Sequence, residues 1–223
     1  MTKRIDGRTA RGLRTRQRVH ELILSAYIDL IRRGVPIPTA RDVAERAGLS
    51  PRVIFKHFSD LRALRLASFN RILAQSREFF PRDISARGSA AQRLELFLKK
   101  QLPRLEYVTP IRRTAAMVEG VDPDVAKAMK AAHALVARDL EKALGPALKH
   151  FPRGEKRKLL TALHMICSWP SWEHLRAHHH LSPSRARSLT RSIALAVLAE
   201  AERRIRAAQS GAAPDGGQSS RNN

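Results

Sequence analysis

The segment Thr39–Phe58 reads TARDVAERAGLSPRVIFKHF and contains two short helix signals on either side of a turn. Thr39 with Asp42 three residues later is a variant of the capping box that starts a helix. Ser50 followed by proline is a second start, because serine is a favoured N-cap and proline is tolerated at the first helical position. Gly48 between them can adopt the positive φ that ends one helix and turns the chain. The segment therefore predicts a helix-turn-helix.

Basic residues are in large excess along the whole chain, with 42 Lys and Arg against 20 Asp and Glu and a net charge of +22. This excess favours a polyanionic partner: nucleic acid first, because counterions are released on binding, and an acidic membrane surface second. A solubilising surface is the alternative. Residues 1–18 hold seven Lys or Arg against one acid. We interpret residues 1–15 as a flexible basic arm, which either follows DNA or remains a solvated tail.

The length of 223 residues allows one large or two small domains with a sizeable core. Cys167 is the single cysteine, which excludes a disulfide framework and favours a reducing compartment. No apolar run approaches the roughly 18 residues of a membrane span, and the basic start lacks the apolar segment of a secretory signal. We therefore expect a cytoplasmic protein without a membrane partner.

Apolar residues recur at helical spacing and no stretch alternates with period two, so the expected fold class is all-α with about nine helices. The first helix is predicted over about 15–33, and its apolar face would pack on the helix-turn-helix to form a three-helix head. A long helix after Ser59 would join this head to a C-terminal helical bundle. Beyond a break at 81–89, helices are predicted over about 90–107 with an interruption or a kink at Pro103, and over 110–119, 123–149, 154–179 and 183–208.

The helix predicted over 183–208 is apolar on nearly every side in its middle, so it must be buried on more than one side. Burial inside the monomer is one interpretation. The other is a two-fold dimer contact made together with the preceding helix. The candidate interface residues are Leu163, Ile166, Leu189, Ile193 and Val197.

From Arg16 to about Ser76 the sequence resembles the DNA-binding domain of the TetR family of bacterial transcriptional regulators. The matching features are Ile23-Leu24-x-Ala26, Gly34, Thr39-x-x-x-Val43-Ala44, Ala47-Gly48-Leu49-Ser50, Phe55, His57-Phe58 and Leu64. The resemblance implies a TetR-type head over 16–76 and a domain over 81–208 for dimerisation and possible effector binding. The polar composition of residues 209–223, rich in Gly, Ser and Asn, predicts a disordered tail. It also implies that the helix from Ser50 to His57 enters the major groove of DNA.

The residues to which the resemblance assigns DNA contacts are Thr39, Ala40, Arg41, Ser50, Pro51, Arg52, Val53, Phe55, Lys56, His57 and Arg62. Arg52 is the candidate base reader, because its guanidinium can donate to guanine O6 and N7 together; a phosphate contact is the alternative. Lys56 is expected to bind phosphate as a point charge.

The chain departs from the family pattern at three places. Phe55 replaces the usual tyrosine, Val53 replaces threonine or alanine, and Leu61-Arg62 replaces a lysine followed by an acid. Arg62 could take over the backbone contact of that lysine.

Several residues outside the head carry weaker signals. Pro170, between Trp169 and Trp172, predicts a kink in the 154–179 helix. These two tryptophans, with Met129 and His133, are the candidate effector-pocket residues, although packing is the alternative role for each of them. Cys167 is expected to be a small core residue.

A cluster of histidines invites a metal hypothesis, because His174 and His178 have the i, i+4 spacing that can chelate a metal. His164, His179 and His180 lie nearby in the sequence, but no acid or cysteine is placed to complete a site. We expect solvated histidines at a helix end, with no metal and no cofactor.

Together these patterns predict a sequence-specific, ligand-responsive repressor that binds a palindromic operator as a homodimer and is not an enzyme. The expected partners are double-stranded DNA, a second copy of the chain and a small-molecule effector. The alternative is a basic DNA-binding protein of the same fold with little sequence specificity and no effector. A histidine-based metalloenzyme is remote, because no motif supplies base, nucleophile and ligands together.

Overall fold

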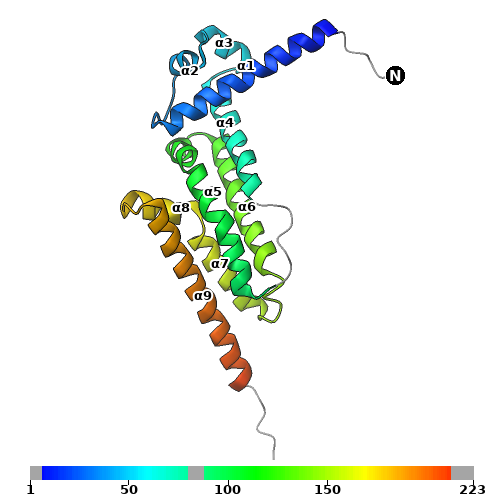
Figure 1. Ribbon diagram of the computed structural model, residues 1–223, viewed down its shortest axis with the longest axis vertical. Helices are drawn as coiled ribbons and strands as arrows, with labels where there is room; N and C mark the ends of the chain where they lie inside the picture. Colours follow the sequence, from blue (N-terminus) through cyan, green and yellow to red (C-terminus); the bar gives the residue numbers. More distant parts are fainter. Residues whose placement is uncertain (1–6, 80–87, 212–223) are drawn as a thin grey trace, which may run out of the picture. The chain divides into compact units, whose positions relative to one another are not determined.

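The computed structural model describes residues 7–79 and 88–211. Every regular element in these two ranges is a helix, and nine of them are α-helices, which confirms the all-α prediction (Figure 1). The α-helices are α1 (Gly7–Arg32), α2 (Ala40–Ala47), α3 (Pro51–His57), α4 (Leu61–Ser76), α5 (Ala90–Val118), α6 (Pro123–Leu144), α7 (Arg153–Ile166), α8 (Trp169–Glu173) and α9 (Pro183–Gly211). A 3₁₀ turn, η1 (Arg77–Phe79), follows α4, and a π-helical turn, η2 (His174–His178), follows α8.

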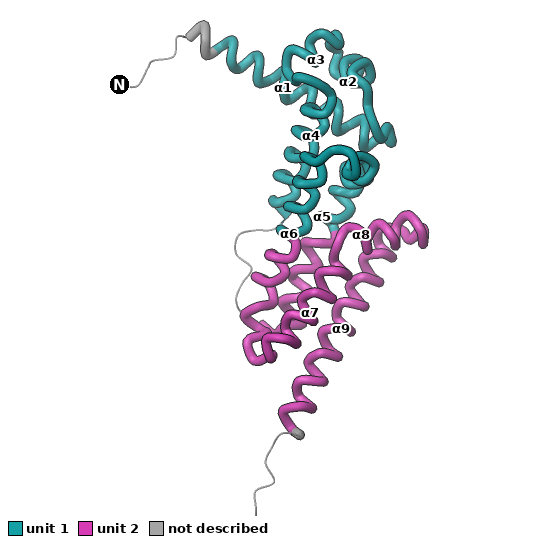
Figure 2. The backbone as a smooth tube through the Cα atoms, turned by 180° about the vertical axis from the view of Figure 1, so that it is seen from behind, with its two compact units in different colours: residues 1–82, 103–135 teal, residues 83–102, 136–223 magenta. Residues whose placement is uncertain are grey.

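The chain forms two compact units, shown in different colours in Figure 2. The first unit comprises residues 1–82 and 103–135, and the second comprises residues 83–102 and 136–223. Helices α5 and α6 each contribute to both units. The first unit therefore contains, beside the expected head over 16–76, parts of α5 and α6 that the sequence assigned to the C-terminal domain.

The core of the head lies between α1, α2, α3 and α4. Ile23 and Tyr27 of α1, Val43 of α2, Ile54 of α3 and Leu64 of α4 are all at most 1% exposed. Each such apolar side chain contributes roughly 1.5–3 kcal/mol when it is fully buried. The predicted packing of the first helix on the helix-turn-helix is confirmed.

Helix α1 begins earlier than expected, at Gly7 instead of about Thr15. The Thr15 hydroxyl donates to the carbonyl of Arg11 (3.1 Å), so Thr15 lies inside the helix and does not cap it. Arginine, leucine and alanine are good helix formers, and no proline interrupts the segment. The expected arm over 1–15 is therefore helical from residue 7, and residues 1–6 lie outside the described ranges.

Helix α5 is one continuous helix, although Pro103 and Pro110 lie inside it. The predicted interruption at Pro103 and the separate 110–119 helix were wrong. An interior proline costs about 3 kcal/mol, but Leu102, Leu105 and Val108 around the two prolines are at most 6% exposed. Their burial, at roughly 1.5–3 kcal/mol for each side chain, is similar in size to the cost of the two prolines and offsets it.

The helix predicted over 154–179 is divided into α7, α8 and η2, so the expected kink inside one helix was wrong. Helix α7 ends at Ile166, Ser168 is extended (φ −82°, ψ 159°), and Pro170 lies in the first turn of α8. The Ser168 and Ser171 hydroxyls both donate to the carbonyl of Met165, at 2.7 and 2.6 Å. These bonds satisfy an acceptor at the end of α7, where no further helical turn is present to do so.

Buried polar groups close the helix ends in the second unit. The Arg93 guanidinium donates to the carbonyls of Ala143 and Lys142 at the end of α6. The Gln101 amide donates to the carbonyl of Cys167 (2.9 Å) at the break between α7 and α8. Cys167 is 0% exposed, which confirms the prediction of a small core residue, and this burial raises the pKa of its thiol to about 12.

The ends of other elements also differ from the sequence boundaries. Helix α6 stops at Leu144, five residues earlier than predicted, and α9 continues through residue 211. The rest of the expected tail, 212–223, and most of the expected break over 81–89 lie outside the described residues. Over the ranges that the structure describes, no helix has the length and apolar character needed to cross a bilayer.

Candidate nucleic-acid interface

The start of α2 is fixed by the predicted capping box. The backbone N–H of Thr39 donates to Asp42 Oδ2 (2.8 Å), and the N–H of Asp42 donates to Thr39 Oγ1 (3.2 Å). The backbone N–H of Thr39, together with its hydroxyl, lowers the pKa of the Asp42 carboxyl. The capping box thus holds Thr39, Ala40 and Arg41 in place at the beginning of α2.

Gly48 makes the turn between α2 and α3. Its φ of 65° and ψ of 35° are left-handed, and its N–H donates back to the last carbonyls of α2. The N–H of Leu49 donates to the carbonyl of Ala44 (2.9 Å), which completes a Schellman-type closure. The predicted role of Gly48 is confirmed.

Replacing Gly48 with alanine is expected to destabilise the chain by roughly 1–2 kcal/mol, because an L-residue is strained in the left-handed region. A Cβ at Gly48 would meet no atom within 4 Å, so the backbone conformation alone is tested. Gly12 lies inside α1 and is the matched control, since alanine there is expected to stabilise by about 0.5–1 kcal/mol. Urea unfolding followed by circular dichroism measures both changes. An equal effect of the two substitutions on stability would contradict the left-handed backbone conformation of Gly48.

Helix α3 begins as expected, with Ser50 extended (φ −91°, ψ 152°) and Pro51 as its first residue. The Ser50 hydroxyl, however, makes no capping hydrogen bond, so this part of the prediction was wrong. The N–H of Val53 donates instead to the backbone carbonyl of Ser50 (2.9 Å). The Ser50 hydroxyl is exposed and remains available to a ligand.

One side of α3 anchors the helix and another side faces solvent. Ile54 is 1% exposed, whereas Phe55 is 50% exposed. Arg52 and Lys56 are also exposed, and their i, i+4 spacing, with Phe55 between them at i+3, places all three on one side. Val53 and His57 are half-buried at the margin of this surface. We call Arg52, Phe55 and Lys56 the recognition surface.

The remaining candidates of the helix-turn-helix lie close to the recognition surface in the chain. Thr39, Arg41, Ser50 and Pro51 are exposed, and Ala40 is half-buried. In Figure 1, α2 and α3 lie next to one another. The predicted DNA-contacting residues of the segment 39–57 therefore lie on, or directly before, the two neighbouring helices α2 and α3.

His20 of α1 also belongs to this region and was missed from the sequence. Its ring stacks on Phe58 at a centroid distance of 4.5 Å and lies 6.1 Å from the ring of His57. Burial, with His20 and Arg16 nearby, lowers the pKa of His57. The shift favours the neutral form of the His57 imidazole. Nothing in the local sequence pattern links His20 to the helix-turn-helix.

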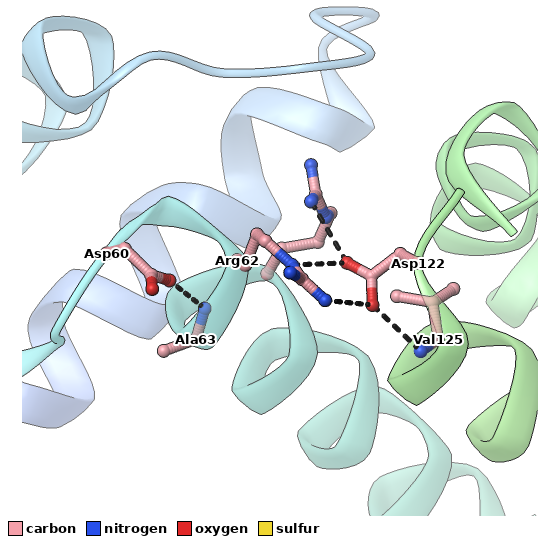
Figure 3. A network of polar contacts seen from close by, with 6 residues as sticks. Asp60, Arg62, Ala63, Asp122 and Val125 are labelled. Atoms are coloured by element: carbon pink, nitrogen blue, oxygen red, sulfur yellow. Dashed lines mark hydrogen bonds and ion pairs between the residues drawn. The ribbon is translucent and has the colours of Figure 1, made fainter.

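Arg62, at the start of α4, has a protein partner that the sequence did not indicate (Figure 3). Its guanidinium donates to both carboxylate oxygens of Asp122, at 3.3 and 3.2 Å. Arg65 Nη2 donates to the same carboxylate at 3.2 Å, and Asp122 Oδ1 also accepts from the N–H of Val125. The Asp122 side chain is 5% exposed, while that of Arg62 is 57% exposed. The predicted phosphate contact of Arg62 would therefore compete with this ion pair.

The Asp122 carboxylate links the turn between α5 and α6 to α4, within the first unit, through hydrogen bonds from Arg62 and Arg65. Its hydrogen bond with Arg62, and then those with Val125 and Arg65, lower the pKa of the Asp122 carboxyl from 3.8 to about 2. The sequence Asp122-Pro123 is a recognisable helix start. The two arginine partners lie about sixty residues away, and no local pattern identifies them.

The pH dependence of stability should report this carboxylate. Because the pKa of Asp122 is lower in the folded chain than in the unfolded chain, the ionised carboxylate stabilises the fold. This stabilisation is fully present above the unfolded pKa, near 3.8, and is lost as the pH falls through the folded pKa of about 2. We expect the difference in unfolding free energy between the natural chain and Asp122→Asn to be constant from neutral pH to about pH 4 and to shrink below it. Urea unfolding across this range measures the difference. A difference that persists undiminished at about pH 2 would contradict the assignment.

The four candidate effector residues are divided between the two units. In the first unit, Arg112 Nη1 donates to Met129 Sδ (2.7 Å), and Arg112 Nη2 lies 2.9 Å from His133 Nε2. Arg112 is buried, and this burial lowers its pKa. In the second unit, Trp172 is 1% exposed and belongs to the core, while Trp169 is half-buried. The four residues do not form one site within either unit.

The candidate dimer residues also differ in exposure. Leu163 is 0% exposed, so its assignment to an interface was wrong: it packs in the core of the second unit. Ile166 and Val197 are half-buried, whereas Leu189 and Ile193 are 40% and 41% exposed. Helix α9 thus has one buried side and one exposed apolar side.

His174, His178, His179 and His180 are exposed, as expected for histidines near a helix end. His174 Nε2 and His179 Nε2 lie 3.2 Å apart. In the described part of the chain, no group of three or more histidine, cysteine or acidic residues is placed to hold a metal ion.

No family model and no curated protein matches this chain. Among solved structures, a crystal structure from Rhodococcus sp. titled "putative TetR-family transcriptional regulator" is similar, with a TM-score of 0.61 and 18% sequence identity. The match covers 80% of this chain and 99% of the Rhodococcus chain. The chain therefore has the fold of the TetR family, as the resemblance over Arg16–Ser76 predicted.

Proposed function

We propose that this chain is a sequence-specific DNA-binding regulator of transcription. The observation that carries the proposal is the recognition surface: Arg52, Phe55 and Lys56 project from a short helix whose other side is anchored by buried Ile54. The major groove of B-DNA accepts an α-helix, and the leading residues of that helix reach the base edges.

The three side chains of the recognition surface supply different contacts. Arg52, in the first turn of α3, can donate to guanine O6 and N7 together. Phe55 has no hydroxyl for phosphate, but an exposed apolar ring can contact the methyl group of thymine. Lys56 supplies a point charge for a phosphate. A surface with one base-reading cation and one apolar contact favours recognition of a defined sequence.

The chain acts as a homodimer in this proposal. Leu189 and Ile193 give α9 an exposed apolar side, and Met165 of α7 is 63% exposed in the same unit. A two-fold interface would cover these side chains. Two heads related by a two-fold axis require a palindromic operator with half-sites about one helical turn, or a multiple, apart. Repression, released by a small-molecule effector, is the regulatory mode that we propose.

A second candidate function is DNA binding without sequence preference. It is favoured by the net charge of +22 and by the exposed Arg11, Arg16 and Arg18 at the beginning of α1. Phosphate contacts of this kind are strong but carry no sequence information.

Selection from a random DNA pool with the purified full-length chain separates the two functions. Sequence-specific binding should enrich a palindrome whose half-sites are about one turn apart. A pool that stays random after repeated rounds, although DNA is retained, would contradict specific regulation. The oligomeric state, measured by sedimentation, should be a dimer and should become monomeric in Leu189→Glu/Ile193→Glu.

A further inference from the structure

A pocket of about 430 Å³ lies within the second unit, between α6 and one side of α7. Its lining includes Glu141 of α6 and, from α7, Arg153, Lys156, Arg157, Leu160 and His164. None of the residues that the sequence indicated for an effector lines this pocket.

The pocket carries more positive than negative charge. Three cationic side chains line it together with one carboxylate, and that carboxylate, Glu141, is already paired with Lys156 at 2.9 Å. Over residues 7–79 and 88–211, no ion pair or hydrogen bond engages the side chain of Arg153 or Arg157. Two guanidinium groups therefore line the pocket without an ion-pair partner among the described residues.

The placement of these two arginines is unfavourable without a ligand. Arg153 and Arg157 are spaced i, i+4 on α7, and like charges at this spacing repel one another. Arg153 is also the first residue of α7, where the helix dipole disfavours a cation. An anion bound between the two side chains would relieve both effects, and the guanidinium fork matches the geometry of carboxylate and phosphate.

The other end of the pocket has a different character. Leu160 and His164 follow Lys156 at successive i, i+4 positions, so the lining extends along α7 over about 16 Å from Arg153. Leu160 presents an apolar surface. His164 Nε2 is buried and has no hydrogen-bond partner within the described residues. An inorganic anion would satisfy only the arginine end, whereas an anion on an apolar body would also cover Leu160.

We propose that this pocket binds a small organic anion, with Arg153 and Arg157 holding a carboxylate or phosphate group and Leu160 contacting the apolar body. The use of this site for an effector rests on the proposed regulatory function. Ligand binding itself does not depend on the proposed function, because every residue that lines the pocket belongs to the second unit and none belongs to the DNA-binding head.

Calorimetry on the full-length chain tests the proposal without DNA. The probes are octanoate and phenylacetate, with 1-octanol as the uncharged analogue and inorganic phosphate as the anion without an apolar body. We expect saturable binding of at least one carboxylate. Its affinity should fall about 10-fold or more in Arg153→Gln/Arg157→Gln, since two charge-assisted contacts are lost. The control Arg185→Gln/Arg187→Gln removes two exposed charges from α9 and should leave the affinity unchanged.

Three outcomes would overturn the proposal: no binding of either carboxylate at millimolar concentrations, equal binding by the two double variants, or binding of 1-octanol or phosphate as tight as that of the carboxylates. DNA binding is measured in a separate experiment, by fluorescence anisotropy with a labelled duplex. A chain that binds octanoate through the arginines but shows no sequence-specific DNA binding would refute the regulatory function and leave the pocket in place.

Discussion

Replacing Arg52 with alanine is expected to weaken binding to the selected operator by about 5- to 150-fold, corresponding to roughly 1–3 kcal/mol. Arg52 is exposed in the first turn of α3, where a side chain can reach base edges, and its fork can engage one guanine through two hydrogen bonds. Discrimination at one base pair of each half-site should be lost with it. Fluorescence anisotropy at fixed salt, on the operator and on operators with single base changes, measures both effects.

Lys56 provides the matched comparison, because it is exposed on the same side of α3 and carries the same charge. Lys56→Ala should weaken binding to all duplexes alike and reduce the salt slope by about one phosphate contact, while base discrimination persists. If Arg52→Ala behaves in the same way as Lys56→Ala, Arg52 is a phosphate contact and does not read a base.

Replacing Asp122 with alanine is expected to lower the free energy of unfolding by roughly 1.5–3 kcal/mol, the range for hydrogen bonds to charged groups. Three residues donate four hydrogen bonds to this carboxylate, and its removal leaves Arg65, whose side chain is 13% exposed, without this partner. The corresponding fall in melting temperature for a chain of this size is about 3–12 °C. Thermal and urea unfolding followed by circular dichroism measure the change.

Asp124 is the control for this prediction, since it is an exposed acid in the first turn of α6 only two residues away. Asp124→Ala should change the stability by less than about 0.5 kcal/mol, as is usual for surface positions. A double variant with Arg62→Ala should show non-additive effects, because the two side chains are in direct contact. Equal stability of Asp122→Ala and Asp124→Ala would show that the Asp122 contacts add nothing to the fold.

The head could be predicted from the sequence because its signals are local. The capping box of Thr39 and Asp42, the left-handed Gly48 and the proline at the start of α3 each act within a few residues. Apolar periodicity then placed Ile54 and its partners in a common core. The recognition surface follows from the same periodicity, because the positions opposite a buried anchor must be exposed.

The elements that were predicted wrongly depend on interactions that no local pattern records. Tertiary burial keeps α5 continuous through Pro103 and Pro110, although each proline taken alone predicts a break. Leu163 shows a related limit: an apolar stripe identifies a buried side of a helix, but not whether the same subunit or a second one covers it. The Asp122 ion pairs and the pocket beside Arg153 and Arg157 join separate elements, so only the three-dimensional structure shows them.

The central claim is that the recognition surface reads a DNA sequence, and the most direct measurement is a salt titration of binding to two duplexes, the selected operator and a random sequence of equal length. The account predicts an operator affinity at least about 10³-fold tighter at physiological salt, a preference that base contacts supply and phosphate contacts cannot. Equal affinities for the two duplexes, falling with one common steep salt slope, would contradict it and favour binding through charge alone.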